Sequence, residues 1–81
     1  MLAMSKHEKA LQALRTNPRD WRIEQLEALA HHLGLKVRKP GGSHVVFQKD
    51  DCPLEVSVPA HRPIKPVYIA QFLALIDWKT P

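Results

Sequence analysis

The feature that most constrains this chain is the pair of glycines at 41–42, followed directly by an alternation of polar and apolar residues. Glycine has no Cβ and takes conformations that other residues avoid, so the pair predicts a tight turn. In the run 43–48 the larger apolar side chains favour one side of the predicted strand, whereas His44 takes the other side. The basic run 36–39 lies just before the glycines. The pattern therefore predicts an ionisable ring on a rigid strand, close to a cluster of positive charge.

Two further segments, 35–38 and 54–58, alternate in the same way. Three short alternating runs joined by turns of a few residues predict an antiparallel meander with one buried face. The open face would show His44 directly opposite Ser57 or diagonal to it, because only those registers agree with the predicted burial. The residues expected on the core face are Leu35, Val37, Val45, Phe47, Leu54, Val56 and Val58, and Lys36 and Arg38 are expected beside His44 if the first two strands pair.

Helical spacing of apolar residues predicts two helices before these strands. Ser5 and Glu8 fit a capping box at the start of the first helix, and the pair at 17–18, Asn-Pro, ends it. Asp20 is expected to cap the second helix. Gly34 is expected to end that helix, because glycine takes the left-handed conformation without strain. We expect the first helix to pack against the second helix or against a partner.

A third helix is expected after the strands, with Pro66 in its first turn. Helices on one side of a small antiparallel sheet give a two-layer α+β domain, here in the order α-α-β-β-β-α. The chain is expected to form one domain over 1–81, with a helical extension over 1–20, a core over 21–77 and a tail over 78–81. The residues expected to cover the sheet are Val67, Ile69, Ala70, Leu73 and Ile76, flanked by Tyr68 and Phe72.

The composition indicates in which cellular compartment the protein lies and what kind of partner it binds. The chain has 81 residues, a single cysteine at Cys52 and a net charge of +4. A lone cysteine forms no internal disulfide, no apolar run approaches the ~20 residues of a membrane span, and the start lacks a secretory signal. We therefore expect a cytoplasmic protein with no membrane partner. Residues 35–66 hold six basic and three acidic residues, which favours an anionic partner near His44 or, equally, a solvated surface.

Three short motifs, taken in order, resemble those of the HicA toxins: Gly42-Ser43-His44-Val45-Val46-Phe47, Val58-Pro59-Ala60-His61 and Lys65-Pro66. The resemblance covers about Ile23 to Asp77, and residues 1–20 extend beyond the shortest members. HicA toxins are small mRNA interferases of type II toxin–antitoxin modules, with a fold related to the double-stranded-RNA-binding domain. The resemblance implies that His44 is the catalytic histidine, that mRNA is the substrate and that a HicB-type antitoxin is the partner. It leaves the role of His61 open.

The residues themselves fit metal-free cleavage of RNA. Such cleavage needs a group that takes the proton of the ribose 2′-OH, a group that protonates the leaving 5′-oxygen, and positive charge beside the phosphorane. Histidine exchanges protons near neutral pH, so His44 is the candidate base, or the acid if the substrate runs the other way. His61 is the candidate for the second proton transfer, or else a turn histidine that binds backbone. The candidate contacts to RNA phosphate are Lys36, Arg38, Lys39, Ser43, Arg62 and Lys65.

The acidic and histidine pairs of the chain do not predict a metal site. Asp50 and Asp51 are adjacent in an expected turn, a pattern more typical of turn chemistry than of magnesium binding. His31 and His32 point about 100° apart on a helix, so they cannot hold one ion together, and we expect both on the surface. We expect no metal and no cofactor.

Two other functions remain open on the residues alone. The same basic face would suit a noncatalytic RNA-binding module, in which His44 only stacks or hydrogen-bonds. Apolar patches would suit an interaction protein that docks a partner. The substitution His44→Ala separates the nuclease from the RNA-binding module, because cleavage should vanish while RNA binding survives.

Overall fold

The computed structural model describes residues 5–61 and 63–79. Three helices and a three-stranded antiparallel sheet follow one another in the predicted order, so the chain is a small α+β domain. Within this part of the chain, none of the helices combines the length and the apolar character that crossing a bilayer requires. The elements are α1 (Lys6–Thr16), α2 (Ile23–His32), β1 (Lys36–Arg38), β2 (His44–Gln48), β3 (Glu55–Pro59) and α3 (Pro66–Asp77).

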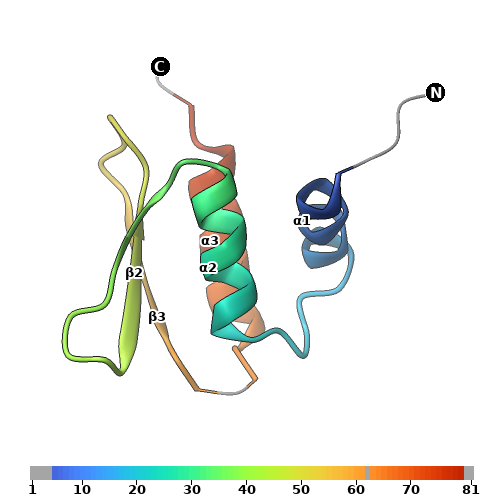
Figure 1. Ribbon diagram of the computed structural model, residues 1–81, viewed down its shortest axis with the longest axis horizontal. Helices are drawn as coiled ribbons and strands as arrows, with labels where there is room; N and C mark the ends of the chain where they lie inside the picture. The colour runs from blue at the N-terminus through green and yellow to red at the C-terminus, as the bar shows by residue number, and fades with distance from the viewer. Residues whose placement is uncertain (1–4, 62, 80–81) are drawn as a thin grey trace.

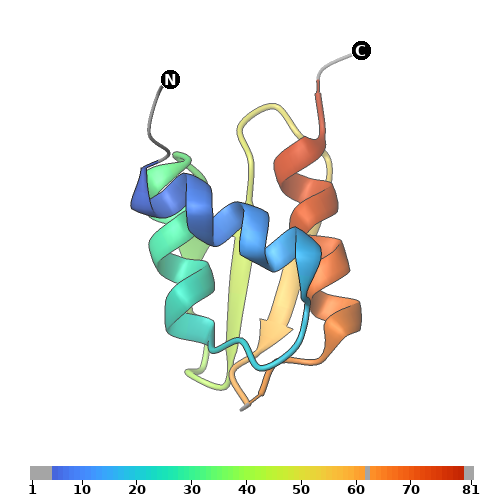
Figure 2. The same cartoon turned by 90° about the vertical axis from the view of Figure 1, so that its right-hand side faces the viewer.

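Helices α2 and α3 lie against one face of the sheet, and the opposite face is left open (Figure 1). Helix α1 lies on the outer side of this helix pair and crosses it when seen from that side (Figure 2). Its contacts with α2 confirm the first of the two packing expectations. Arg15 of α1 also forms an ion pair with Asp77 at the end of α3, with Nη2 2.5 Å from Oδ1. The hydrogen bond from Arg15 lowers the pKa of Asp77 and raises the pKa of Arg15 itself.

The central strand of the sheet is β2, because the strand order is β1-β2-β3. Val37 pairs with Phe47, and Phe47 in turn pairs with Val56. These three residues share a face of the sheet, since directly paired side chains of an antiparallel ladder point the same way. On this face Phe47 and Val56 are buried and Val37 is half-buried, which confirms the covered face that the alternation predicted.

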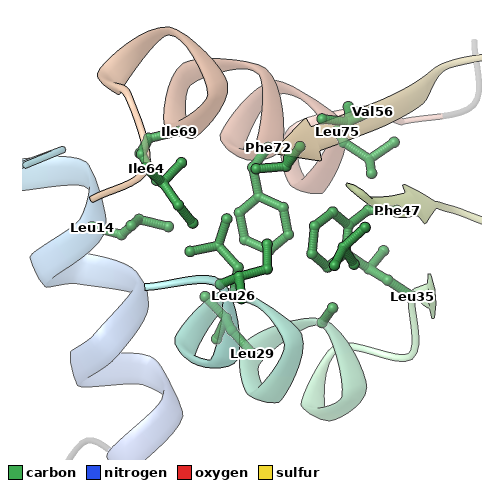
Figure 3. Close-up of a cluster of buried hydrophobic side chains, with 14 of the residues drawn as sticks. Leu14, Leu26, Leu29, Leu35, Phe47, Val56, Ile64, Ile69, Phe72 and Leu75 are labelled. Atoms are coloured by element: carbon green, nitrogen blue, oxygen red, sulfur yellow. The ribbon is translucent and has the colours of Figure 1, made fainter. Parts of the chain in front are cut away.

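Two phenylalanines form the centre of the core (Figure 3). Phe47 of β2 and Phe72 of α3 are fully buried, and their ring centroids lie 4.9 Å apart in an edge-to-face arrangement. Such aromatic pairs contribute about 0.5–1.5 kcal/mol beyond the area they bury. Leu26 of α2 and Leu14 of α1 are buried in the same cluster. The core therefore extends from the sheet through the helix pair to α1.

The structure confirms three of the predicted helix ends. The side chain of Ser5 accepts a hydrogen bond from the backbone N–H of Glu8 at 3.1 Å, and Asn17 ends α1. Gly34 follows the end of α2 with a φ of +76°, in the left-handed region where glycine is favoured. Local chemistry therefore determines where α1 begins and where both helices end.

The predicted capping of α2 by Asp20 is wrong. Asp20 has a φ of +65°, so the chain makes a left-handed turn there and the helix begins only at Ile23. The residue that precedes the helix is Arg22, whose backbone N–H donates to the side chain of Gln25 at 2.8 Å. The carboxylate of Asp20 consequently lies in the loop between α1 and α2, outside the first helical turn.

The predicted core position of Leu54 is also wrong. Strand β3 begins one residue later, at Glu55, and 45% of Leu54 is exposed. A left-handed turn at Asp51, with a φ of +63°, precedes Cys52, which is buried in the core cluster in place of the leucine. The cysteine is therefore a small apolar core residue next to the turn.

The prediction for α3 is confirmed for Ile69, which is buried, and for Leu73 and Ile76, which pack against the core, and it is wrong for Val67 and Ala70. The fully buried residues are Ile69, Phe72 and Leu75, three residues apart along the helix, whereas Val67 is 55% exposed and Ala70 is also exposed. The helix is rotated so that its aromatic residue meets Phe47, because the largest apolar side chain gains most from burial. Phe72, which was expected to flank the contact, is at its centre.

The expectation that the tail begins at residue 78 is wrong for Trp78. This residue is half-buried against the core, and its carbonyl accepts a hydrogen bond from Lys49 Nζ at 2.6 Å. The same ammonium group donates to the carbonyl of Ile76 at 2.9 Å. The turn after β2 is thereby fastened to the end of α3. The last two residues of the expected tail, 80–81, lie outside the described residues.

Candidate functional site

His44 is the first residue of β2, and its side chain is exposed. Across the ladder it pairs with Pro59 and lies diagonal to Ser57, which is one of the two placements that the alternation predicted. The next residue, Val45, is buried against the helices, so His44 belongs to the opposite, open face. The structure therefore presents an imidazole to solvent at one end of the central strand.

The ring of His44 has one polar neighbour that bears on its chemistry. The hydroxyl oxygen of Ser43 lies 3.2 Å from Nδ1 of His44. A hydroxyl can donate to a bare ring nitrogen or accept from a protonated one, so this contact suits either tautomer. Within the described residues no protein group contacts the other ring nitrogen, Nε2, through a hydrogen bond. Nε2 is thus the nitrogen that can exchange a proton with a bound molecule.

The backbone around His44 is fastened to the segment that follows β3. The carbonyl of Ser43 accepts a hydrogen bond from the N–H of Ala60 at 3.0 Å. The preceding turn contains Gly41 and Gly42, with φ of +74° and +80°, which confirms the need for glycine at both positions. His44 therefore follows a turn whose exit is tied to the neighbouring strand.

The three basic residues that precede the glycine turn are all ion-paired, a feature that the sequence did not reveal. Each pair joins two different elements or loops, so neither periodicity nor spacing along the chain could have identified it. Part of the positive charge expected beside His44 is consequently neutralised by carboxylates. The pairs are Arg38 with Glu55, Lys36 with Asp50 (3.2 Å) and Lys39 with Glu27 (2.6 Å).

The register decides which of these cations lies near His44. Arg38 pairs with Val46, two residues along β2 from His44, and is therefore diagonal to it. Lys36 pairs with Gln48, at the far end of the strand. The expectation that both flank His44 holds for Arg38 and is wrong for Lys36.

The pair of Arg38 with Glu55 spans the central strand. The two residues lie on β1 and β3, on either side of β2, so their contact crosses the open face. Val46 of β2 is only 8% exposed although it points away from the helices and lies outside the core cluster. The side chains that meet across β2 account for this burial. The open face is thus partly covered, with His44 at its uncovered end.

His61 and Lys65 lie in the segment between β3 and α3, and both are exposed. They line a cavity of about 540 Å³ and a smaller one of about 120 Å³, and His44 lines neither. Arg62, the remaining predicted phosphate contact, lies outside the described residues. The structure therefore groups His44 with Ser43 and Arg38, and places His61 and Lys65 in adjoining hollows.

Sequence reasoning missed two further features. Arg19 and Asp20, from the loop between α1 and α2, line the larger cavity together with His61. The rings of His7 and His32 are stacked between α1 and α2, with centroids 4.0 Å apart. His32 is exposed, as predicted for the end of α2, but no pattern in the sequence pointed to His7 as its partner.

The described residues contain no cluster of three or more histidine, cysteine or acidic side chains placed to hold a metal ion. No family model, no curated protein and no solved structure matches this chain. What the site can do therefore has to be inferred from its geometry and chemistry.

Proposed function

We propose that the protein is an endoribonuclease that cleaves mRNA without a metal ion, with His44 as the group that transfers protons. The observation that carries the proposal is the exposed imidazole on the central strand, with Nδ1 3.2 Å from Ser43 Oγ and with Nε2 free of hydrogen bonds to the described residues. Histidine is the side chain that most often acts as a general acid or base, and an exposed one can reach a bound molecule without a large rearrangement of its surroundings.

The chemistry follows from the substrate. Nε2 of His44 takes the proton of a ribose 2′-OH while that oxygen bonds to the adjacent phosphorus. The bond from phosphorus to the 5′-oxygen breaks, a solvent water molecule donates a proton to that oxygen, and the proton held by His44 then neutralises the hydroxide that remains. The products are a 2′,3′-cyclic phosphate and a 5′-hydroxyl. The hydroxyl of Ser43 supports both protonation states of the ring, since it donates to Nδ1 or accepts from it.

Arg38 is the cation best placed to contact the reacting phosphate. It lies diagonal to His44 on the open face, and its side chain is 60% exposed in the pair with Glu55. Surface ion pairs contribute only about 0–1 kcal/mol, so a phosphate can replace the carboxylate at little cost. A guanidinium that binds phosphate oxygens would stabilise the charge of the phosphorane.

The resemblance to the HicA toxins supports a more specific assignment. On that basis the protein acts as the toxin of a type II module in the cytoplasm, and a HicB-type antitoxin restrains it. An acidic antitoxin that covers His44 and Arg38 would compete directly with RNA phosphate. Co-expression tests this part of the proposal. A small acidic protein encoded by a neighbouring open reading frame should restore growth to cells that this protein inhibits.

The decisive experiment compares the wild type with His44→Ala on a labelled single-stranded RNA in the presence of EDTA. We expect the substitution to slow cleavage by roughly 10²–10⁴-fold, the usual contribution of general acid–base catalysis. Ser43→Ala should cause a smaller loss. The matched control is His31→Ala, which removes another exposed histidine from the end of α2 and should leave cleavage unchanged.

The product ends and the binding data complete this test. A 2′,3′-cyclic phosphate identifies the ribose hydroxyl as the nucleophile. If the wild-type protein binds RNA but leaves it intact, the nuclease proposal is wrong and the protein is a noncatalytic RNA-binding module. Cleavage that survives in His44→Ala at the wild-type rate would refute the role of His44.

A further inference from the structure

The larger of the two cavities that His61 lines lies between two loops that are distant in sequence. Its walls come from the loop between α1 and α2 and from the segment that leads into α3, and its volume is about 540 Å³. That volume falls within the roughly 300–1,000 Å³ typical of small-ligand sites. The lining residues are Arg19, Asp20, His61, Pro63, Ile64, Lys65 and Pro66.

A backbone hydrogen bond holds the two walls together. The N–H of Ile64 donates to the carbonyl of Trp21 at 2.9 Å. Ile64 is buried in the core cluster, and Trp21 packs against that cluster while its indole N–H donates to the carbonyl of Asn17 at 2.6 Å. The cavity is therefore bounded by segments anchored in the core, although the side chains at its rim are exposed.

The cavity lies at the same edge of the molecule as His44. In both ribbon views the glycine turn, the loop before α2 and the segment after β3 lie along the lower edge, and in Figure 1 the segment after β3 lies between the other two (Figures 1 and 2). The bond between Ala60 and Ser43 joins the residue next to His61 to the residue next to His44. An RNA strand that passes His44 and continues along this edge can consequently place another of its nucleotides in the cavity.

The lining combines three kinds of surface that a nucleotide needs. Lys65 and Arg19 supply positive charge for a phosphate, and Pro63 and the ring of His61 supply flat surfaces for a base. Asp20 supplies a carboxylate, which only accepts hydrogen bonds. Within residues 5–61 and 63–79, that carboxylate has no ion-pair or hydrogen-bond partner.

The carboxylate of Asp20 sets the expected preference among bases. Guanine carries two adjacent donors on its Watson–Crick edge, N1–H and the N2 amino group, and two carboxylate oxygens accept them together. Adenine and cytosine each place an acceptor beside their donor, and uracil offers a single donor flanked by acceptors. A negatively charged group also disfavours a ligand that is only an anion, so the cavity suits a base and its phosphate better than phosphate alone.

We propose that this cavity binds one guanine nucleotide of the RNA substrate, with Asp20 on the base and Lys65 and Arg19 on its phosphate. The inference rests on the proposed action on RNA. It gives the loop that follows α1 a role in choosing where the strand is bound, a role separate from the proton transfer by His44.

The test is a titration of the full chain with 5′-GMP, 5′-AMP, 5′-CMP and 5′-UMP, followed by the backbone amide signals in NMR spectra. 5′-GMP should shift the signals of Trp21 and Ile64 and bind about tenfold or more tightly than the other three. Asp20→Asn should remove this preference, since a bidentate contact to a base commonly gives discrimination of that size. Lys65→Ala should weaken the binding of all four nucleotides to the same extent.

The matched control for Asp20→Asn is Asp51→Asn. Asp51 also has a left-handed backbone and an exposed side chain, but it lies in the turn before β3, away from the cavity. Its substitution should leave 5′-GMP binding unchanged, and both variants should keep the wild-type amide spectrum elsewhere.

Three results would overturn the inference: no shift at Trp21 or Ile64 with 5′-GMP, equal binding of the four nucleotides, or equal binding of inorganic phosphate. The titration needs no cleavage, so it separates the two proposals. Guanine selectivity in a chain that does not cut RNA would refute only the nuclease. Cleavage dependent on His44 in a chain that binds no guanine would refute only the cavity site.

Discussion

The two faces of the sheet differ in how firmly their residues are held. On the covered face, Phe47 and Val58 are fully buried and contact a continuous apolar core. On the open face, Arg38 and Glu55 meet across β2 while both remain substantially exposed. Burial makes a substitution on the first face costly, whereas contacts on the second face exchange readily with solvent or a ligand. The comparison shows that stability and proposed function occupy opposite sides of the same three strands.

The largest expected effect is a difference in stability between substitutions at two adjacent residues of β2 that point to opposite faces of the sheet. Phe47→Ala should cost about 3–5 kcal/mol, because it removes a fully buried ring and leaves a cavity against Phe72. Val46→Ala, on the open face, should cost roughly 1–2 kcal/mol, because it removes only two carbon atoms. A domain of this size has only about 4–12 kcal/mol of total stability, so the first variant should be close to unfolding. Urea unfolding followed by circular dichroism measures both, and equal losses would contradict the comparison.

A smaller effect is expected from releasing the cation on the open face. Glu55→Gln removes the carboxylate that pairs with Arg38, so RNA should bind a few-fold more tightly. The dependence of affinity on salt should steepen by about one counterion, since one more cation is available for phosphate. Binding of a labelled RNA to a His44→Ala background at several salt concentrations measures this without cleavage.

Asp51→Asn is the control for this substitution, because it removes the same charge from an exposed turn. If both variants bind RNA equally well, the gain reflects net charge alone and Arg38 has no special role.

The smallest effect is expected for the ion pair that joins α1 to α3. Asp77→Asn should lower the stability by no more than about 1 kcal/mol, because the pair of Asp77 with Arg15 is well exposed, and RNA binding should not change. The pKa of Asp77 is lowered in the folded protein, so the pair stabilises the fold above the usual carboxyl value of 3.8. That contribution should disappear as the pH falls through the lowered pKa, and the two proteins should then unfold alike. A difference in stability between the two proteins that grows as the pH falls would contradict the expected direction of this pH dependence.

The alternation of the strands was enough to predict the covered face and the placement of His44. Period-two burial determines which side each residue takes, and this parity left only two positions for His44 relative to Ser57. Helix ends were predicted where a single local interaction decides them, as at Ser5 and Gly34. These features depend on residues close together in the chain.

The features that the sequence did not predict depend on distant residues. Left-handed turns at Asp20 and Asp51 make α2 begin later than predicted and leave Leu54 exposed. No pattern in the neighbouring residues predicted either turn. The rotation of α3 follows from the position of Phe47 across the core. The partner of Arg38 is decided by the register of three strands, and the cavity beside His61 by the packing of two loops.

The hydrogen bond between Ile64 and Trp21 uses only main-chain atoms, and this has a consequence for how the molecule can change over time. Side chains at positions 19 and 65 can be exchanged while the two loops keep their relative placement, whereas position 20, with its left-handed backbone, accepts chiefly aspartate, asparagine and glycine. If the proposed functions are correct, a lineage could therefore alter the preferred base by single replacements, with little loss of folding stability and no change at His44. Selectivity and turnover would then be inherited as separable traits on one small scaffold.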